Sequence, residues 1–253
     1  MEYKMVKRVN VRYIAEVGMF IGIILLMELT GLNKIPIVPG LNMTLSMIPI
    51  AVGAMLLGPL AGTILGFVYG VTSLFNAITG QGGLTHAFFQ YSWFLTIILC
   101  VVARTLVGLA TGWLFRIFQR LDKKRIWCYF AGGLLAPMLN TISFMGFLVL
   151  FFYNTAEVQQ KAADLGAKNV LMFIILFVGF NALIEWGAGL VVGGSVAKGV
   201  AAALKRYEPI PLFKEVKVPV EKPDETELPA KIEADETAEA QEEPEPTDEP
   251  KEK

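Results

Sequence analysis

The sequence has few of the residues from which soluble enzymes and disulfide-rich domains are built. Its 253 residues include one His and two Cys, and no Asp, Glu, Lys or Arg occurs from residue 35 to residue 103. A soluble domain needs charge on its exterior and cannot bury so long an uncharged run. These absences exclude an ordinary soluble enzyme, a nucleic-acid-binding protein and a secreted domain held together by disulfides. With 54% hydrophobic residues, the chain is predicted to be a polytopic membrane protein.

Motifs of catalysis and metal binding are missing as well. The chain has no G-x-x-x-x-G-K-[ST] phosphate loop, no H-E-x-x-H and no C-x-x-C, and no credible Ser/His/Asp set. Cys100 and Cys128 are isolated residues in apolar stretches, which favours packing roles. We therefore expect no enzyme activity, no ATP hydrolysis by the chain itself, no metal and no cofactor. No inverted repeat typical of many secondary transporters is visible either.

The net charge of −1 conceals two oppositely charged parts. Residues 208–253 hold 6 Lys against 16 Asp and Glu, a charge of −10, whereas residues 1–207 hold 16 basic and 7 acidic residues, a charge of +9. The acidic part has too few large apolar residues to compensate the entropy of ordering. We predict a transmembrane substrate-binding domain at 1–207 and a disordered acidic cytoplasmic tail at 208–253. The tail is either merely solvated, or its charge interacts with the basic inner face of the protein or with a partner.

Six segments approach the roughly 20 apolar residues that a spanning helix needs, so the predicted fold is an all-α integral membrane protein with six transmembrane helices. The second segment is short, and Gly58-Pro59 separates it from the third, which indicates an antiparallel hairpin. With the N-terminus inside, the cytoplasmic loops carry 12 basic residues and the outer loops 3, so both termini are predicted to be cytoplasmic. The predicted segments are approximately 13–30, 43–57, 60–78, 87–116, 126–153 and 170–197.

Ionisable residues at membrane depth are costly, and they are candidate functional groups for that reason. Glu16 and Glu28 lie near the ends of the first segment, where they can reach the interface. Arg104 and Glu185 precede the inner boundary by about 18 and 20 Å, at 1.5 Å per helical residue. Both should therefore lie near the bilayer centre and form a pair. Two roles stay open at this point: a structural ion pair, or an Arg104 that binds the carboxylate of a solute.

Other polar residues share these helices and depths. Gln90 and Trp93 lie on the fourth predicted segment with Arg104, Asn140-Thr141 follows Pro137 on the fifth, and Asn181 lies one turn before Glu185 on the sixth. These groups are predicted to form a pocket that opens outward. The candidate substrate-binding residues are Gln90, Trp93, Arg104, Asn140, Thr141, Asn181 and Glu185.

Glycines repeat every fourth residue at several places, which lets another backbone approach closely. For the stripe of Gly58, Gly62, Gly66 and Gly70 we favour packing inside the bundle. The pair Gly18 and Gly22 lies in the cytoplasmic half of the first segment. It either packs internally or docks a separate membrane partner.

The stretch from Thr44 to Phe67, with its L-G-P-x-x-G-x-x-x-G turn, resembles the substrate-binding S components of energy-coupling factor (ECF) vitamin transporters, in the riboflavin and pantothenate group. Arg104-Thr-Leu-Val-Gly108, Leu139-Asn-Thr141 and Glu185 support the resemblance, which covers about residues 10–205. It implies a bacterial, multi-pass cell-membrane protein without catalytic activity. Such a protein captures a vitamin outside and then joins a transmembrane coupling protein and two ATPases.

The resemblance also implies roles for particular segments. Small residues on the first helix meet the coupling protein in this family, and Gly18 and Gly22 occupy the comparable place. The loop at 31–42 matches a lid over the vitamin. Because Arg104 suits a carboxylate, pantothenate is slightly favoured as cargo, with riboflavin and folate as alternatives.

Two functions of other classes remain open on the sequence. A membrane scaffold of envelope or cell-shape assembly would tolerate apolar replacements at Arg104, Asn140, Asn181 and Glu185. A stand-alone secondary transporter would drive uptake from an ion gradient without any ATPase.

Overall fold

The computed structural model describes residues 3–31, 34–38, 41–205 and 210–219. The chain divides into a helical unit, residues 9–213, and a second unit formed by residues 1–8 and 214–253. The described part of the second unit is a two-stranded sheet in which β1 (Tyr3–Val9) pairs with β4 (Phe213–Pro219).

Strand β4 differs from the prediction that the chain lacks ordered structure from residue 208 onward. Residues Phe213–Pro219 form a strand, and β1 supplies the pairing partner. Residues 220–253 lie outside the described residues, so the predicted disordered tail remains a prediction there.

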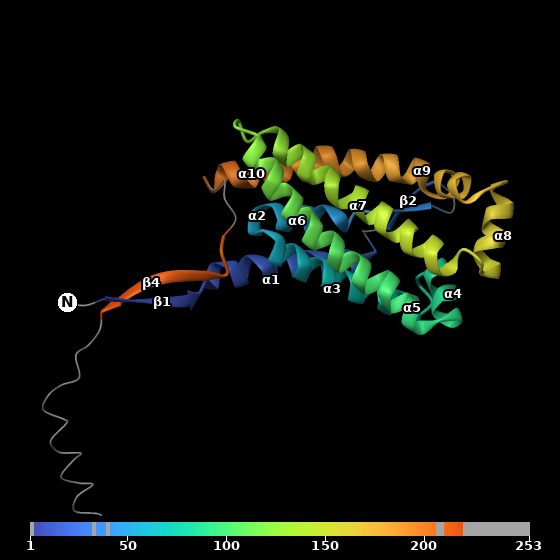
Figure 1. Ribbon diagram of the computed structural model, residues 1–253, viewed down its shortest axis with the longest axis horizontal. Helices are drawn as coiled ribbons and strands as arrows, with labels where there is room; N and C mark the ends of the chain where they lie inside the picture. Colours follow the sequence, from blue (N-terminus) through green and yellow to red (C-terminus); the bar gives the residue numbers. More distant parts are fainter. Residues whose placement is uncertain (1–2, 32–33, 39–40, 206–209, 220–253) are drawn as a thin grey trace, which may run out of the picture. The chain divides into compact units, whose positions relative to one another are not determined.

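In its described residues, the helical unit contains α-helices, two π-helical segments and one β-hairpin, arranged as Figure 1 shows. In chain order its helical elements are α1 (Val11–Thr30), α2 (Met47–Leu57), α3 (Pro59–Ile78), α4 (Leu84–Tyr91), α5 (Trp93–Ile97), η1 (Ile98–Val102), α6 (Ala103–Leu121), α7 (Trp127–Phe152), α8 (Ala156–Asp164), α9 (Val170–Ala188), η2 (Gly189–Gly193) and α10 (Gly194–Ala203).

Five helical stretches of the described residues are long and apolar enough to cross a membrane, instead of the six predicted. They are α1, α3, the continuous α5–η1–α6, α7, and the continuous α9–η2–α10. The second predicted segment is the exception. Helix α2 has 11 residues, about 16 Å, which is much less than the roughly 30 Å of the hydrocarbon core. The chain before it, Leu41–Thr44, is strand β3.

The fourth predicted segment, at 87–116, is also interrupted. Helix α4 ends at Tyr91, and Ser92 has extended backbone angles (φ −157°, ψ 106°) before α5 begins at Trp93. The backbone carbonyl of Ser92 accepts hydrogen bonds from the Thr96 amide at 3.1 Å and from the Thr96 hydroxyl at 2.9 Å. Ser92 thus starts a new helix, as serine commonly does at helix N-caps. The spanning helix runs from Trp93 to Leu121.

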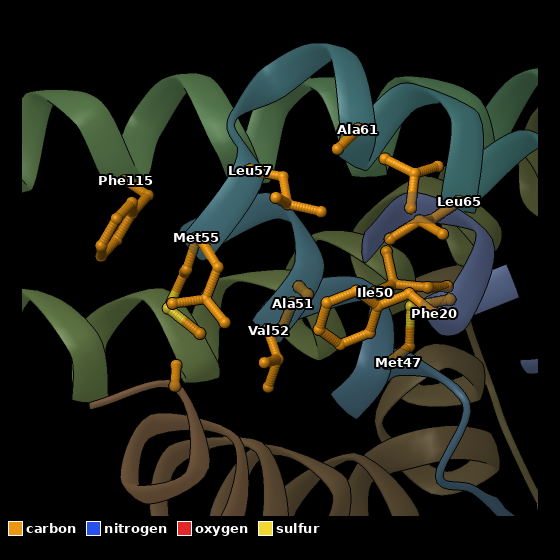
Figure 2. Packing of buried hydrophobic residues seen from close by; sticks show 14 of the residues in the cluster. Phe20, Met47, Ile50, Ala51, Val52, Met55, Leu57, Ala61, Leu65 and Phe115 are labelled. Atoms are coloured by element: carbon orange, nitrogen blue, oxygen red, sulfur yellow. The ribbon is translucent and has the colours of Figure 1, made fainter. Parts of the chain in front are cut away.

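Helix α2 forms the centre of the larger hydrophobic core. All but one of its residues are buried, so the helix is apolar on every side, which is typical of a helix enclosed by others. Figure 2 shows Met47, Ile50, Val52 and Met55 of α2 among side chains of neighbouring helices. The short second segment is therefore the packing centre of the bundle.

The glycine stripe of α3 packs inside the fold, as we favoured from the sequence. A Cβ atom built on Gly62 or Gly66 would meet the backbone carbonyl of Gly108 or Arg104 on α6, and one on Gly70 would meet the backbone of Val101. Such close approach of two helix backbones requires glycine at the contact. The stripe fixes α3 against α6 and η1, and so fixes the place of Arg104.

The chain enters and leaves the helical unit at one end. The backbone amide of Asn10, just before α1, donates a hydrogen bond to the carbonyl of Leu212 at 2.8 Å, and the Asn10 side chain donates to Pro211 at 3.3 Å. That this end faces the cytoplasm remains a prediction from the distribution of basic residues.

Candidate functional site

Arg104 is a buried charge with unusual partners. It is the second residue after η1, is 8% exposed, and donates from Nη1 to the carbonyls of Leu99 at 3.4 Å and Cys100 at 3.2 Å. Its guanidinium carbon lies 4.9 Å from the ring centroid of Tyr69 and 5.7 Å from that of Phe144. Both rings are close enough for cation–π attraction, which offsets part of the cost of burying the charge. A π-helical segment beside such a residue is frequent at functional sites.

The described residues show no salt bridge between Arg104 and Glu185, and their predicted pairing stays a prediction. Within the described part of the chain, the guanidinium contacts backbone carbonyls and aromatic rings, and no group accepts a hydrogen bond from its Nε. Glu185, 7% exposed, instead accepts a hydrogen bond from Asn181 at 3.0 Å. Hydropathy predicts the depth of both residues, but the rotation of each helix about its axis decides which groups meet.

The predicted polar residues of α7 are linked to Arg104, which lies on α6, through Phe144. Asn140 and Thr141 are half-buried and precede Phe144, whose ring faces the guanidinium, by one turn. The Thr141 hydroxyl donates to the carbonyl of Pro137 at 3.0 Å.

Pro137 cannot donate to the carbonyl of Gly133, and this part of α7 packs on η2. A Cβ atom on Gly189 would lie 2.5 Å from that carbonyl, so the two backbones touch there. The contact holds η2, which directly follows the α9 helix of Asn181 and Glu185, against α7.

Gln90 and Trp93 do not join these residues. Gln90 is exposed on α4, on the other side of the break at Ser92 from Arg104. Trp93 is 63% exposed at the start of α5, where its ring lies edge-to-face with Phe94 at 6.0 Å between centroids. The 14-residue separation of Gln90 and Arg104 places them on one face only if the helix between them is continuous, and it is broken at Ser92.

Sequence analysis missed a second polar cluster, formed around Glu28. Its carboxylate accepts hydrogen bonds from the Ser46 hydroxyl at 3.1 Å and from the Asn76 side chain at 3.2 Å. Glu28 therefore joins the end of α1 to the start of α2 and the end of α3. From the sequence, its position near a helix end predicts that it reaches the interface.

A β-hairpin lies between Glu28 and Ser46 in the chain, at the place of the expected lid. Strand β2 (Lys34–Val38) pairs antiparallel with β3 (Leu41–Thr44), with Lys34 opposite Thr44. Strand β3 packs against α9, the helix that carries Asn181 and Glu185. Residues 32–33 and 39–40 of the expected lid lie outside the described residues.

We expect Glu28→Ala to lower the stability of the protein by about 1–3 kcal/mol, because Ser46 and Asn76 lose a charged acceptor in a partly buried place. Thermal unfolding of the purified protein in detergent measures the change. The matched control is Glu16→Ala on the same helix, where Glu16 pairs at 2.8 Å with exposed Arg12 and should contribute at most about 1 kcal/mol. Equal effects of the two variants would contradict a special role for Glu28.

The small-residue pair of α1 points away from the fold. Gly18 and Gly22 are exposed, and a Cβ atom on either would meet nothing within 4 Å. The glycines of α3 are all in close contact with a neighbouring helix, so the α1 pair is different. Its open surface is continuous with exposed Ile14, Leu25 and Leu29.

The described residues contain no group of three or more His, Cys, Asp or Glu side chains that could hold a metal ion. Arg104, Asn140, Thr141, Asn181 and Glu185 instead offer hydrogen-bond donors, acceptors and one fixed positive charge. Such a set can bind and orient a small polar solute, while aromatic rings exclude water from around the guanidinium.

Comparison with known proteins is consistent with this geometry. The chain is 25% identical over 202 residues to the "Pantothenate transporter PanT" of Leuconostoc mesenteroides, a match that covers 77% of this chain and 95% of that protein. The family model described as "ECF transporter, substrate-specific component" matches residues 12–193, which cover the spanning helices from the start of α1 to the end of η2 and leave out α10. This chain therefore belongs to the family of substrate-specific components of ECF transporters, which are multi-pass proteins of the cell membrane.

Proposed function

We propose that this protein captures pantothenate, or a closely similar carboxylate-bearing vitamin, from the outer face of the membrane. It then delivers the cargo through an ATP-driven complex with a transmembrane coupling protein and two ATPases. The protein itself is not catalytic. Membership of the substrate-specific family supports the general role, and the likeness to a pantothenate transporter supports the choice of cargo.

The burial and hydrogen bonding of Arg104 support the choice of pantothenate as cargo. Its charge is buried, its Nε has no acceptor among the described residues, and these residues show no salt bridge between Arg104 and Glu185. A buried guanidinium with a free donor suits a carboxylate ligand, which accepts hydrogen bonds in a planar, forked arrangement. Riboflavin lacks a carboxylate, so this observation favours pantothenate over riboflavin.

The remaining residues have assigned roles in the proposal. Asn140 and Thr141 hydrogen-bond the polar part of the solute, and Asn181 with Glu185 holds the opposite side of the pocket near β3. The β2–β3 hairpin covers the bound solute, and the Glu28 cluster anchors the hairpin. Gly18 and Gly22 form the docking surface for the coupling protein.

The direct test is mass spectrometry of small molecules released from the gently purified full-length protein. We expect one vitamin, pantothenate, in a ratio near one per protein, and tight rebinding without ATP. Release of riboflavin or folate would contradict the proposed cargo but retain the capture role. Failure to bind any solute, together with failure to associate with ATPase partners, would favour a membrane scaffold. Uptake driven by an ion gradient in vesicles without ATPases would favour a secondary transporter.

A further inference from the structure

The connection between α6 and α7 contains a second candidate binding site, formed by residues that have no role in the proposed capture of the vitamin. It lies at the end of the helical unit away from α8, as Figure 1 shows. A cavity of about 380 Å³ opens here, within the usual range of small-molecule sites of about 300–1,000 Å³. Its lining is mostly apolar and consists of Phe118, Leu121, Asp122, Trp127, Cys128 and Ala131.

The shape of the connection is fixed by one carboxylate. Asp122 accepts hydrogen bonds from the backbone amides of Cys128 at 2.9 Å, Ile126 at 2.8 Å and Lys124 at 3.0 Å. These amides, that of Cys128 most of all, lower the pKa of Asp122, so the carboxylate stays ionised at neutral pH. Asp122 thereby caps the start of α7 and holds the cavity open between the two helices.

The rim of the cavity is strongly basic. Residues 116–125 hold five basic residues and one acidic residue, a net charge of +4, and Arg116, Arg120, Lys123 and Lys124 are exposed. The apolar side chains beside the opening are exposed too, Leu121 at 74% and Trp127 at 77%. Tryptophan is enriched at the level of lipid headgroups. An apolar cavity with a cationic rim at that level matches a molecule with an acyl chain and an anionic headgroup.

We propose that the cavity between α6 and α7 binds an anionic phospholipid, with its headgroup on the basic rim of residues 116–125 and part of an acyl chain against Phe118, Trp127 and Ala131. The site is separate from the vitamin pocket, so it does not depend on the proposed cargo. A zwitterionic lipid lacks the net charge that the rim complements. The acidic segment 220–253 of this chain is the competing occupant, because it complements the charge of the rim but not the apolar lining.

The test uses the full-length protein in phosphatidylcholine nanodiscs with Trp93→Phe, Trp113→Phe and Trp186→Phe, so that Trp127 is the remaining tryptophan. Dibrominated phosphatidylglycerol should quench Trp127 with saturation at a few mole per cent, and dibrominated phosphatidylcholine should not. Arg120→Gln with Lys124→Gln should weaken the lipid affinity about 30-fold, since each basic residue contributes roughly fivefold. Arg8→Gln with Arg12→Gln, which removes the same charge elsewhere, should leave the affinity unchanged. Ala131→Phe, which fills the cavity, should abolish the preference.

Native mass spectrometry of the chain with its four tryptophans gives an independent readout, as retained phosphatidylglycerol per protein. Equal quenching by the two brominated lipids would overturn the proposal, and so would a preference that survives both the charge and the cavity variants. A several-fold rise in quenching after deletion of residues 220–253 would also overturn it, because the acidic segment would then be the resident occupant.

Discussion

Replacing Gly18 and Gly22 together by Leu is expected to abolish vitamin uptake while leaving vitamin capture intact. Both positions open away from the fold: among the described residues, nothing lies within 4 Å of a Cβ atom at either, so the leucines have space. They would, however, prevent close approach of a second helix, which is what exposed small residues on a membrane helix permit. Uptake of labelled vitamin by vesicles that contain the ATPase complex should fall to background. Binding to the purified protein should keep its wild-type affinity.

Two glycine variants serve as controls for this result. Gly146→Leu on α7 also replaces an exposed glycine with open space around it, and it should change neither uptake nor capture. Gly62→Leu places side-chain atoms against the Gly108 backbone and should destabilise the fold by about 4 kcal/mol or more, with loss of both activities. Wild-type uptake by the Gly18→Leu/Gly22→Leu variant, with the coupling protein still bound, would contradict docking on this surface.

Arg104→Met is expected to weaken vitamin binding about 100-fold or more. The change removes a charged hydrogen-bond donor from a buried position, and loss of one partner of a buried charged pair costs about 2–5 kcal/mol. Isothermal titration of the purified protein with pantothenate measures the loss. Arg104→Lys keeps the positive charge but not the planar fork, so it should bind more tightly than Arg104→Met and more weakly than the wild type.

A matched control separates binding from folding in this experiment. Arg12→Met makes the same substitution at an exposed position of α1 and should leave the affinity unchanged. Because Arg104 also donates to the carbonyls of Leu99 and Cys100, the melting temperature of each variant must be measured in parallel. A folded Arg104→Met protein that binds pantothenate with wild-type affinity would contradict the carboxylate site.

Much of the fold was predictable because local sequence determines it. Long apolar runs specify α1, α3, α7 and α9, and Gly58-Pro59 specifies the turn before α3. The interior packing of the α3 glycine stripe was predictable too, since only glycine allows such close contact. The break at Ser92 and the burial of α2 at the centre of the bundle were not predicted, because an apolar run shows neither a change of backbone angles nor whether lipid or protein surrounds it.

For the candidate site, the sequence predicts how deep each residue lies in the membrane, but it does not predict which residues contact one another. Distance along a helix places Arg104 and Glu185 at similar depths, but a partner depends on helix rotation and on neighbours from distant parts of the chain. The structure directs Arg104 to Tyr69 and Phe144, and Glu185 to Asn181. Glu28 shows the same limit: its position near a helix end predicts an interfacial side chain, but Ser46 and Asn76 reach it only after α1, α2 and α3 pack together.

The sequence by itself determined that this protein lies in a membrane, that it has no catalytic motif, and which family it resembles, because composition and short motifs are properties of the chain. Only the tertiary structure decided that Arg104 lies against Tyr69 and Phe144 and that Gly18 and Gly22 face outward. These are properties of the arrangement of helices around one another. Packing sets that arrangement, and hydropathy does not.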